Sequence, residues 1–137
     1  MKIPANHIQV CHGKLTVNVP KNLFSGNDAE PVESKVIPFR ELMMERYPWL
    51  SENSMDVFMK EARKVMLRTM EEETKGKSVA ESMIEKGNVE GAIKHMLMWA
   101  EKEPGNPDIW YYLGQLYFKV GKNEDAHKAM NRGRSLI

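Results

Sequence analysis

The sequence predicts a mainly α-helical fold made of antiparallel helical hairpins, preceded by an N-terminal segment that is irregular or forms a β-hairpin. Two features predict the helical part. The C-terminal half is similar to itself at an offset of 34 residues, and residues 53–70 place apolar side chains three and four positions apart. The third feature is the N-terminal stretch, where apolar and polar residues alternate as they do in strands. We therefore expect a helical body with an N-terminal part of a different kind.

Composition limits the classes of function. The chain has 137 residues, enough for one core, and its 20 Lys and Arg against 19 Asp and Glu give a net charge of +1. Because no strong overall field results, we expect it to bind neither nucleic acid nor membrane. Cys11 is the only cysteine and no signal-peptide core is present at the start, which favours a cytoplasmic protein.

Residues 1–37 form the predicted N-terminal arm. The stretches Ile8–Val10 and Leu15–Val19 alternate apolar with polar residues on either side of Gly13, which favours a short hairpin. From residue 20 to residue 38 the chain mixes turn formers with charges and shows no helical period, which predicts a poorly ordered loop or linker.

The predicted helical domain covers residues 38–137. Pro38 suits a first helical turn, and Pro48 should end that first helix. A second helix follows, capped by Ser51 or Asn53, and we expect it to end between Glu71 and Gly76 where the apolar stripe is lost. Ten of the 11 methionines fall in this domain, where they fill a helical core or, alternatively, line a binding surface.

The C-terminal half contains two copies of one pattern. Gly87 and Gly121 fall where a helix end favours a left-handed residue, and Ala92 and Ala126 fall where two helices cross closely. The same offset of 34 pairs further residues, namely Glu90 with Glu124, Lys94 with Lys128 and Met96 with Met130. A fixed period of this length predicts an array of helical hairpins.

The later copy, about residues 107–137, resembles the tetratricopeptide repeat, because it contains Trp-x-x-Leu-Gly-x-x-Tyr from Trp110 to Tyr117. The earlier copy, about residues 73–106, departs from the pattern and has Gly76 at the Trp position. The resemblance implies a short right-handed solenoid. Since two hairpins bury little core alone, we expect the helix over residues 53–70 to cap the first hairpin. We expect the C-terminal end to self-associate or to dock on a partner.

In the tetratricopeptide family the first helix of each hairpin builds most of a concave, partner-binding face. The resemblance assigns this role to Lys77, Glu81, Glu85, Asp108, Tyr111, Gln115 and Lys119. Tyr111 and Gln115 share a helix face, although packing of Tyr111 or Tyr112 against the neighbouring hairpin is the alternative. Capture of a chaperone tail is not expected, because Glu81 would repel its carboxylate. The basic residues Lys122, Lys128, Arg132 and Arg134 are interpreted as a solvated face.

Catalytic chemistry is not expected. His7, Cys11 and His12 are the one metal-like cluster, but a structural zinc site needs four ligands, so neither a metal nor any other cofactor is predicted. The leading hypothesis is a scaffold for protein-protein interaction, an adaptor or an assembly chaperone that binds a partner segment in its groove. The alternative is a structural subunit that self-associates or joins a larger complex. An enzyme that uses Cys11 is the remote third.

Overall fold

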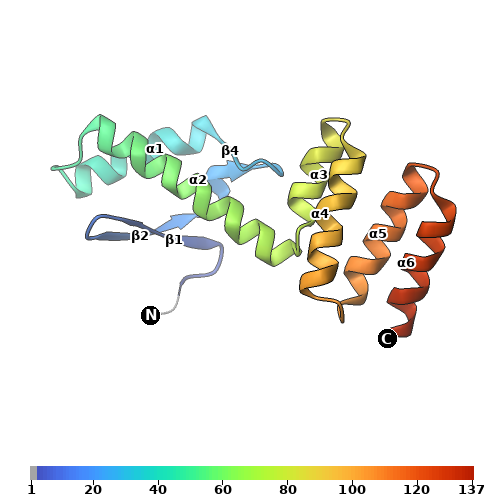
Figure 1. The fold of residues 1–137 in the computed structure, drawn as a ribbon. Coiled ribbons are helices and arrows are strands. Elements are labelled where there is room, and N and C mark those ends of the chain that lie inside the picture. The colour runs from blue at the N-terminus through green and yellow to red at the C-terminus, as the bar shows by residue number, and fades with distance from the viewer. Residues whose placement is uncertain (1–2) are drawn as a thin grey trace. The chain divides into compact units, whose positions relative to one another are not determined.

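The computed structural model describes residues 3–137, and these residues are mainly α-helical with an N-terminal β segment, as predicted (Figure 1). The chain divides into two compact units, Met1–Thr69 and Met70–Ile137. The strands and the first helices belong to the first unit, and the repeats belong to the second.

The N-terminal hairpin is confirmed. Strands β1 (His7–His12) and β2 (Leu15–Pro20) pair antiparallel, with Val10 opposite Val17. Gly13 has a φ of +61° in the connecting turn, a conformation that residues with a Cβ rarely adopt. Because strand side chains alternate between faces, Ile8 and Val10 are buried while their neighbours are more exposed.

The predicted linker over residues 20–38 is structured, so that expectation was wrong. It forms a 3₁₀ turn η1 (Lys21–Leu23), the short pair β3 (Phe24–Ser25) and β4 (Glu30–Pro31), and the start of α1 (Glu33–Arg46). Leu23, Phe24 and Ala29 are buried, and these three apolar residues between the turn formers hold the segment in place. Helix α1 starts five residues before Pro38, because the Val32 carbonyl accepts the N–H groups of Lys35 and Val36.

Helix α2 (Glu52–Thr74) begins where Ser51 caps it, since Ser51 Oγ accepts the Ser54 N–H at 3.1 Å. Its buried residues Met55, Phe58 and Ala62 all belong to the first unit. The Phe58 ring packs against Phe39 of α1 and against His12 of β1, with centroids 6.4 and 6.3 Å apart. The N-terminal hairpin and α1 of the same unit therefore cover this part of the α2 face. Capping of the first repeat hairpin by the later part of α2 stays a prediction.

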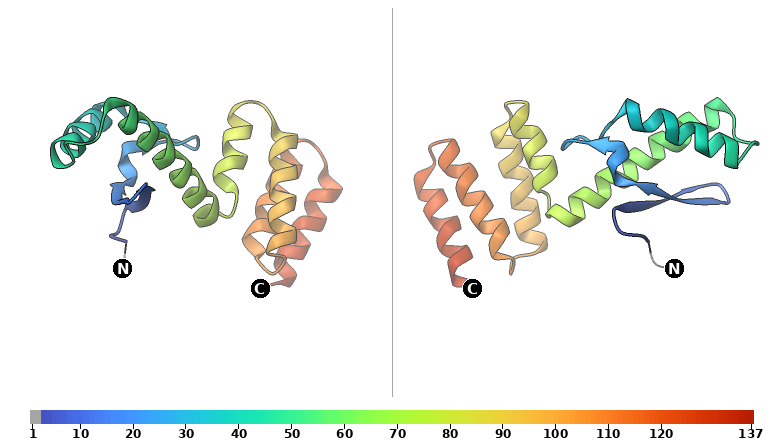
Figure 2. Two further views of the ribbon diagram at one scale, coloured as in Figure 1. Left: turned by 60° about the vertical axis from the view of Figure 1, so that its left-hand side comes forward. Right: turned by 180° about the vertical axis from the view of Figure 1, so that it is seen from behind.

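The second unit consists of two antiparallel helical hairpins in series, α3 (Lys77–Glu85) with α4 (Val89–Lys102) and α5 (Pro107–Lys119) with α6 (Asn123–Ser135). Both views of Figure 2 show these four helices side by side. Gly87 and Gly121 have φ angles of +80° and +78°, and Ala92 and Ala126 are fully buried. Both repeat-based expectations are confirmed.

Trp99 of α4 is the largest fully buried side chain in the core of the repeats. A Cβ on Gly76 would lie 2.2 Å from its Cδ1 atom, so the indole needs the space that a glycine leaves. Gly76 is the position at which the earlier copy lacks the tryptophan found at 110 in the later copy. In the first hairpin, the Trp99 indole on the second helix therefore packs against the backbone of Gly76. Gly76 is the position at which the repeat pattern has a tryptophan on the first helix.

Gly76→Ala tests this packing. Gly76 also has a φ of +87°, so alanine adds backbone strain to the steric clash, and we expect the free energy of unfolding to fall by at least about 2 kcal/mol. Gly105→Ala is the matched control, because nothing lies within 4 Å of its Cβ position, and it should change stability by less than about 0.5 kcal/mol. Urea unfolding followed by circular dichroism measures both. Equal stability of the two variants would contradict the proposed role of Gly76.

Candidate functional site

The seven residues assigned to partner binding all lie on the first helices of the two hairpins. Lys77, Glu81 and Glu85 belong to α3, and Asp108, Tyr111, Gln115 and Lys119 belong to α5. Two of them, Lys77 and Glu81, contact Tyr112. The sequence had suggested only a packing role for Tyr112. The Tyr112 hydroxyl donates a hydrogen bond to Glu81 Oε1, and Lys77 Nζ lies 5.4 Å from the Tyr112 ring centroid. Tyr112 therefore links the first helices of the two repeats.

The exposed residues of α5 that were assigned to partner binding lie on the same helix face as Tyr112. Asp108, Gln115 and Lys119 are four before, three after and seven after it, and these spacings place side chains on one side of a helix. All three are exposed. We call the following set the first-helix surface: Lys77, Glu81, Glu85, Asp108, Tyr112, Gln115 and Lys119.

Tyr111 turns toward the second helix of its own hairpin. A Cβ on Gly133 of α6 would lie 3.0 Å from Tyr111 Cε1, so the ring packs closely over that glycine. The packing against the neighbouring hairpin that the sequence left open for either tyrosine is made by Tyr112, through Glu81 of α3, whereas Tyr111 packs within its own hairpin. The two adjacent tyrosines differ by about 100° around the helix, which sends Tyr111 to α6 and Tyr112 to α3.

Burial raises the pKa of the Tyr112 phenol, and the hydrogen bond to Glu81 and the charge of that carboxylate raise it further. An ionised phenolate would lose the donor proton and face a carboxylate, so the neutral form is favoured. The surface around Tyr112 consequently presents a hydrogen-bonded aromatic ring with the charged groups of Lys77 and Glu81 beside it.

The metal-like cluster of the N-terminal arm does not converge. Cys11 and His12 are adjacent in β1 and so point to opposite faces of the hairpin. Cys11 Sγ lies 3.6 Å from Thr16 Oγ1, whereas His12 packs on Phe58. Over residues 3–137, no group of three or more His, Cys, Asp or Glu side chains is placed to hold a metal ion.

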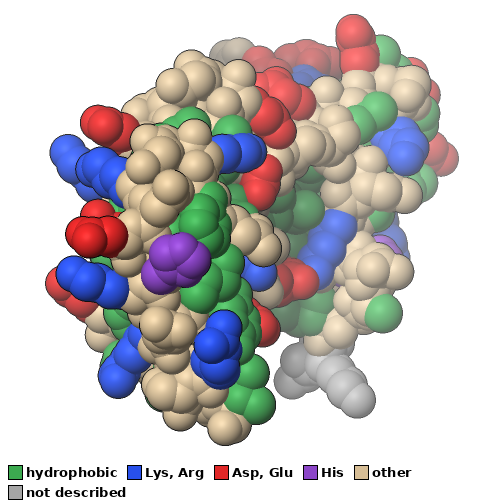
Figure 3. Space-filling model, turned by 90° about the vertical axis from the view of Figure 1, so that its right-hand side faces the viewer, with side chains coloured by type: hydrophobic (Ala, Val, Ile, Leu, Met, Phe, Trp, Pro, Cys, Tyr) green, Lys and Arg blue, Asp and Glu red, His purple; other side chains and the backbone are tan. Residues whose placement is uncertain are grey.

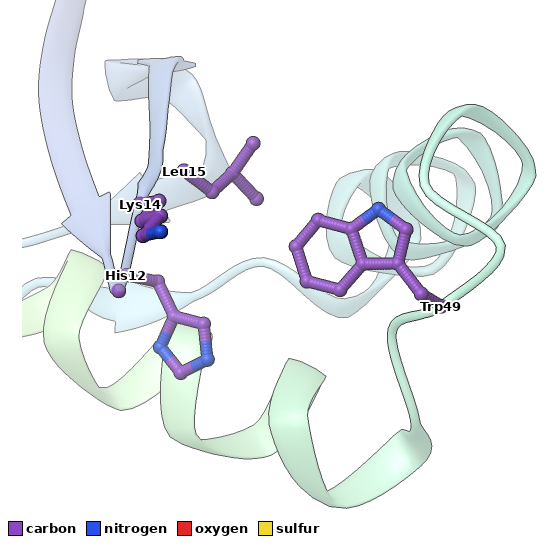
Figure 4. A pocket seen from close by; sticks show the side chains of 5 residues that line it. His12, Lys14, Leu15 and Trp49 are labelled. Carbon is purple, nitrogen blue, oxygen red and sulfur yellow. The ribbon is translucent and has the colours of Figure 1, made fainter.

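A cavity of about 490 Å³ lies at the tip of the N-terminal hairpin. Figure 4 shows the Trp49 indole facing Leu15 and the His12 ring across it. Trp49 is 67% exposed, and its ring contacts Tyr47 edge-on at 6.0 Å. No sequence pattern indicates this residue, because Trp49 follows a helix-ending proline and belongs to no periodic series of apolar residues.

A second cavity, of about 280 Å³, lies among α4, α5 and α6. It is lined by residues of three helices: Leu97, Trp110, Tyr117, Asp125, Lys128, Ala129 and Arg132. We call it the second-helix cavity. Two members of the basic group interpreted as a solvated face, Lys128 and Arg132, thus line a hollow that also contains aromatic rings.

Comparison with known families gives a match to the tetratricopeptide repeat over residues 95–128, from the middle of α4 into α6. The C-terminal half of the chain is therefore tetratricopeptide-like. The matched residues lie in the C-terminal half, which has glycines and alanines at the 34-residue spacing. The tetratricopeptide repeat is a module for protein-protein interaction. No curated protein and no solved structure matches the chain. In the part of the chain that the structure describes, no helix is both long and apolar enough to cross a membrane.

The bond between Tyr112 and Glu81 can be tested by titration. Because the pKa of Tyr112 is raised above the ordinary value of 10.0, its proton should remain bound at a pH where a free tyrosine has ionised. Subtracting the ultraviolet titration of Tyr112→Phe from that of the wild type isolates this phenol.

We expect the midpoint of this difference curve to lie above 10 and to fall in Glu81→Gln, which removes the carboxylate charge. The folded state holds the proton more tightly than the unfolded state, so stability should decline as pH rises above about 10, and less so in Tyr112→Phe. A difference curve centred at or below the ordinary value would contradict the hydrogen bond.

Proposed function

We propose that this protein is a scaffold for protein-protein interaction, an adaptor or an assembly chaperone, that binds a partner segment on its first-helix surface. One observation supports this above all: Tyr112 joins the first helices of both hairpins and is surrounded by exposed polar groups. Partner-binding surfaces commonly combine a rigid aromatic residue with a polar rim. Binding of this kind needs no catalytic group, and we propose no enzymatic activity.

The charges of the first-helix surface favour a partner segment that has both acidic and basic side chains. Lys77 and Lys119 provide positive charge, and Glu85 and Asp108 provide negative charge. The Glu81 carboxylate already accepts the Tyr112 hydroxyl, and its charge disfavours a chain-terminal carboxylate at that point. We place this binding in the cytoplasm, because a reducing compartment suits the exposed free thiol of Cys11.

The test is affinity purification with mass spectrometry, followed by measurement of the affinity for the recovered partner. Lys119→Glu combined with Gln115→Ala changes two exposed residues of the first-helix surface. Reversing an interfacial charge commonly costs about 1–3 kcal/mol, so we expect at least about a tenfold loss of affinity. Both side chains are exposed, so the thermal midpoint should not change.

Lys94→Glu is the matched control, since Lys94 is an exposed lysine of α4 and lies outside the first-helix surface. It should retain the partner. Equal loss in the control and the double variant, or full retention in both, would move the binding site away from the first helices.

The second candidate function is a structural subunit that self-associates through the α5–α6 end of the repeats. Phe118 is 42% exposed there, and its ring meets His127 of α6 edge-on at 5.3 Å. Figure 3, which looks onto this end of the chain, shows hydrophobic side chains beside a histidine with Lys and Arg on both sides. An apolar strip with a charged rim is a common form of interface.

Sedimentation velocity over a range of concentrations tests self-association. If this end pairs with another copy, the wild type should form dimers as concentration rises, and Phe118→Asp should remain monomeric at the same concentrations. Met98→Asp introduces the same charge at an exposed methionine of α4 and should behave as the wild type. A wild type that stays monomeric at high concentration would argue against self-association.

A further inference from the structure

The second-helix cavity has an apolar floor held in a fixed position. The Trp110 Nε1–H donates to the Pro104 carbonyl at 3.0 Å, which fixes the indole, and Ala129 is buried beneath the cavity. Tyr117 lies two turns after Trp110 on the same helix face, and Leu97 of α4 is partly exposed beside them. Such a floor accommodates an aliphatic side chain of a bound molecule.

The rim of the second-helix cavity is cationic at one end. The Arg132 guanidinium carbon lies 5.8 Å from the Trp110 ring centroid. An arginine over an aromatic face keeps its in-plane N–H groups free for a carboxylate. Lys128 is one helical turn earlier, about 5–6 Å away between Cβ atoms. Within residues 3–137 neither cation forms an ion pair with an acidic side chain.

The other end of the second-helix cavity is anionic. Asp125 lines it there, and its charge, after burial, contributes to raising the pKa of the Tyr117 phenol. The cavity therefore changes from negative near Tyr117 to positive near Arg132. A nucleic-acid backbone has no aliphatic side chain to place on the apolar floor, and the whole chain has a net charge of only +1. Both facts disfavour a nucleic-acid backbone.

We propose that the second-helix cavity is a binding site for an acidic, leucine-bearing protein segment. A carboxylate of the segment binds Arg132 and Lys128, and an aliphatic side chain beside it lies on Trp110 and Tyr117. Charge complementarity selects this occupant, since a hollow with unpaired cations and an apolar floor matches a segment that has both features. The site is composed of residues other than those of the first-helix surface, so it does not depend on the function proposed above.

The experiment uses the full ¹⁵N-labelled chain and a synthetic peptide, acetyl-Leu-Glu-Glu-Leu-Leu-Glu-Glu-Leu-amide. Nuclear magnetic resonance follows the indole N–H signals of the three tryptophans during titration. We expect the Trp110 signal to shift, together with the backbone signals of Leu97 and Ala129, while Tyr112 stays unchanged. The same peptide with glutamine in place of glutamate should bind at least tenfold more weakly.

Variants separate the cavity from general charge effects. Arg132→Glu should weaken peptide binding at least tenfold, and Lys128→Gln, a milder change at an exposed residue, should weaken it severalfold. Arg134→Glu changes the net charge equally on the same helix but lies outside the cavity, so it should bind as the wild type does.

Several results would overturn the proposal. They are the absence of any shift at millimolar peptide, equal binding of the glutamine peptide, shifts confined to the first-helix surface, and an equal loss in Arg134→Glu. Tighter binding of a single-stranded DNA oligonucleotide through Lys128 and Arg132 would also overturn it, because it would identify a nucleic-acid site.

Discussion

Burial of the Trp99 indole against the Gly76 backbone is the constraint on which the repeats depend. The side chain is 1% exposed, and its Nε1–H has no acceptor among the described residues, which is costly for a buried polar group. Lys102 Nζ lies 4.5 Å and Lys75 Nζ lies 5.8 Å from the indole, and cations over the ring offset part of that cost. A residue larger than glycine at 76 would push the indole out and separate the first hairpin from the turn that leads into it.

Both candidate surfaces follow from how the second hairpin stacks on the first. On one side, Tyr112 reaches Glu81 only because α5 lies next to α3. On the other side, Leu97 of α4 completes a hollow with residues of α5 and α6. One stacking arrangement thus produces two surfaces of different chemistry. The first has mixed charge around a hydrogen-bonded tyrosine, and the second has an apolar floor with cations at one end.

The first unit is organised by a different contact, the packing of Phe58 between Phe39 and His12. Arg40 supports the same helices, since it forms ion pairs of 2.8 Å with Glu52 and Asp56 that span the turn from α1 to α2. Because both acids are exposed, these pairs contribute modestly, and apolar burial provides most of the stability. The hairpin and the helices of this unit therefore form a small core of their own.

The sequence was sufficient to predict those structural features that depend on the type of a single residue and its local spacing. Glycines 87 and 121 end first helices because positive φ favours glycine, and alanines 92 and 126 are buried because close helix crossings need small side chains. The period of 34 therefore predicted both hairpins. The alternation around Gly13 predicted β1 and β2 for the same kind of reason.

Only the tertiary structure decided which surface each helix face meets. The spacing of the apolar residues in α2 predicted that they are buried. It did not predict that the N-terminal hairpin and α1 cover Phe58. Nor could the sequence assign Tyr111 to Gly133 and Tyr112 to Glu81, since that depends on helices distant in the chain. The second-helix cavity was hidden for the same reason: Lys128 and Arg132 appear solvated on α6 alone, and α4 and α5 place aromatic and apolar groups beside them.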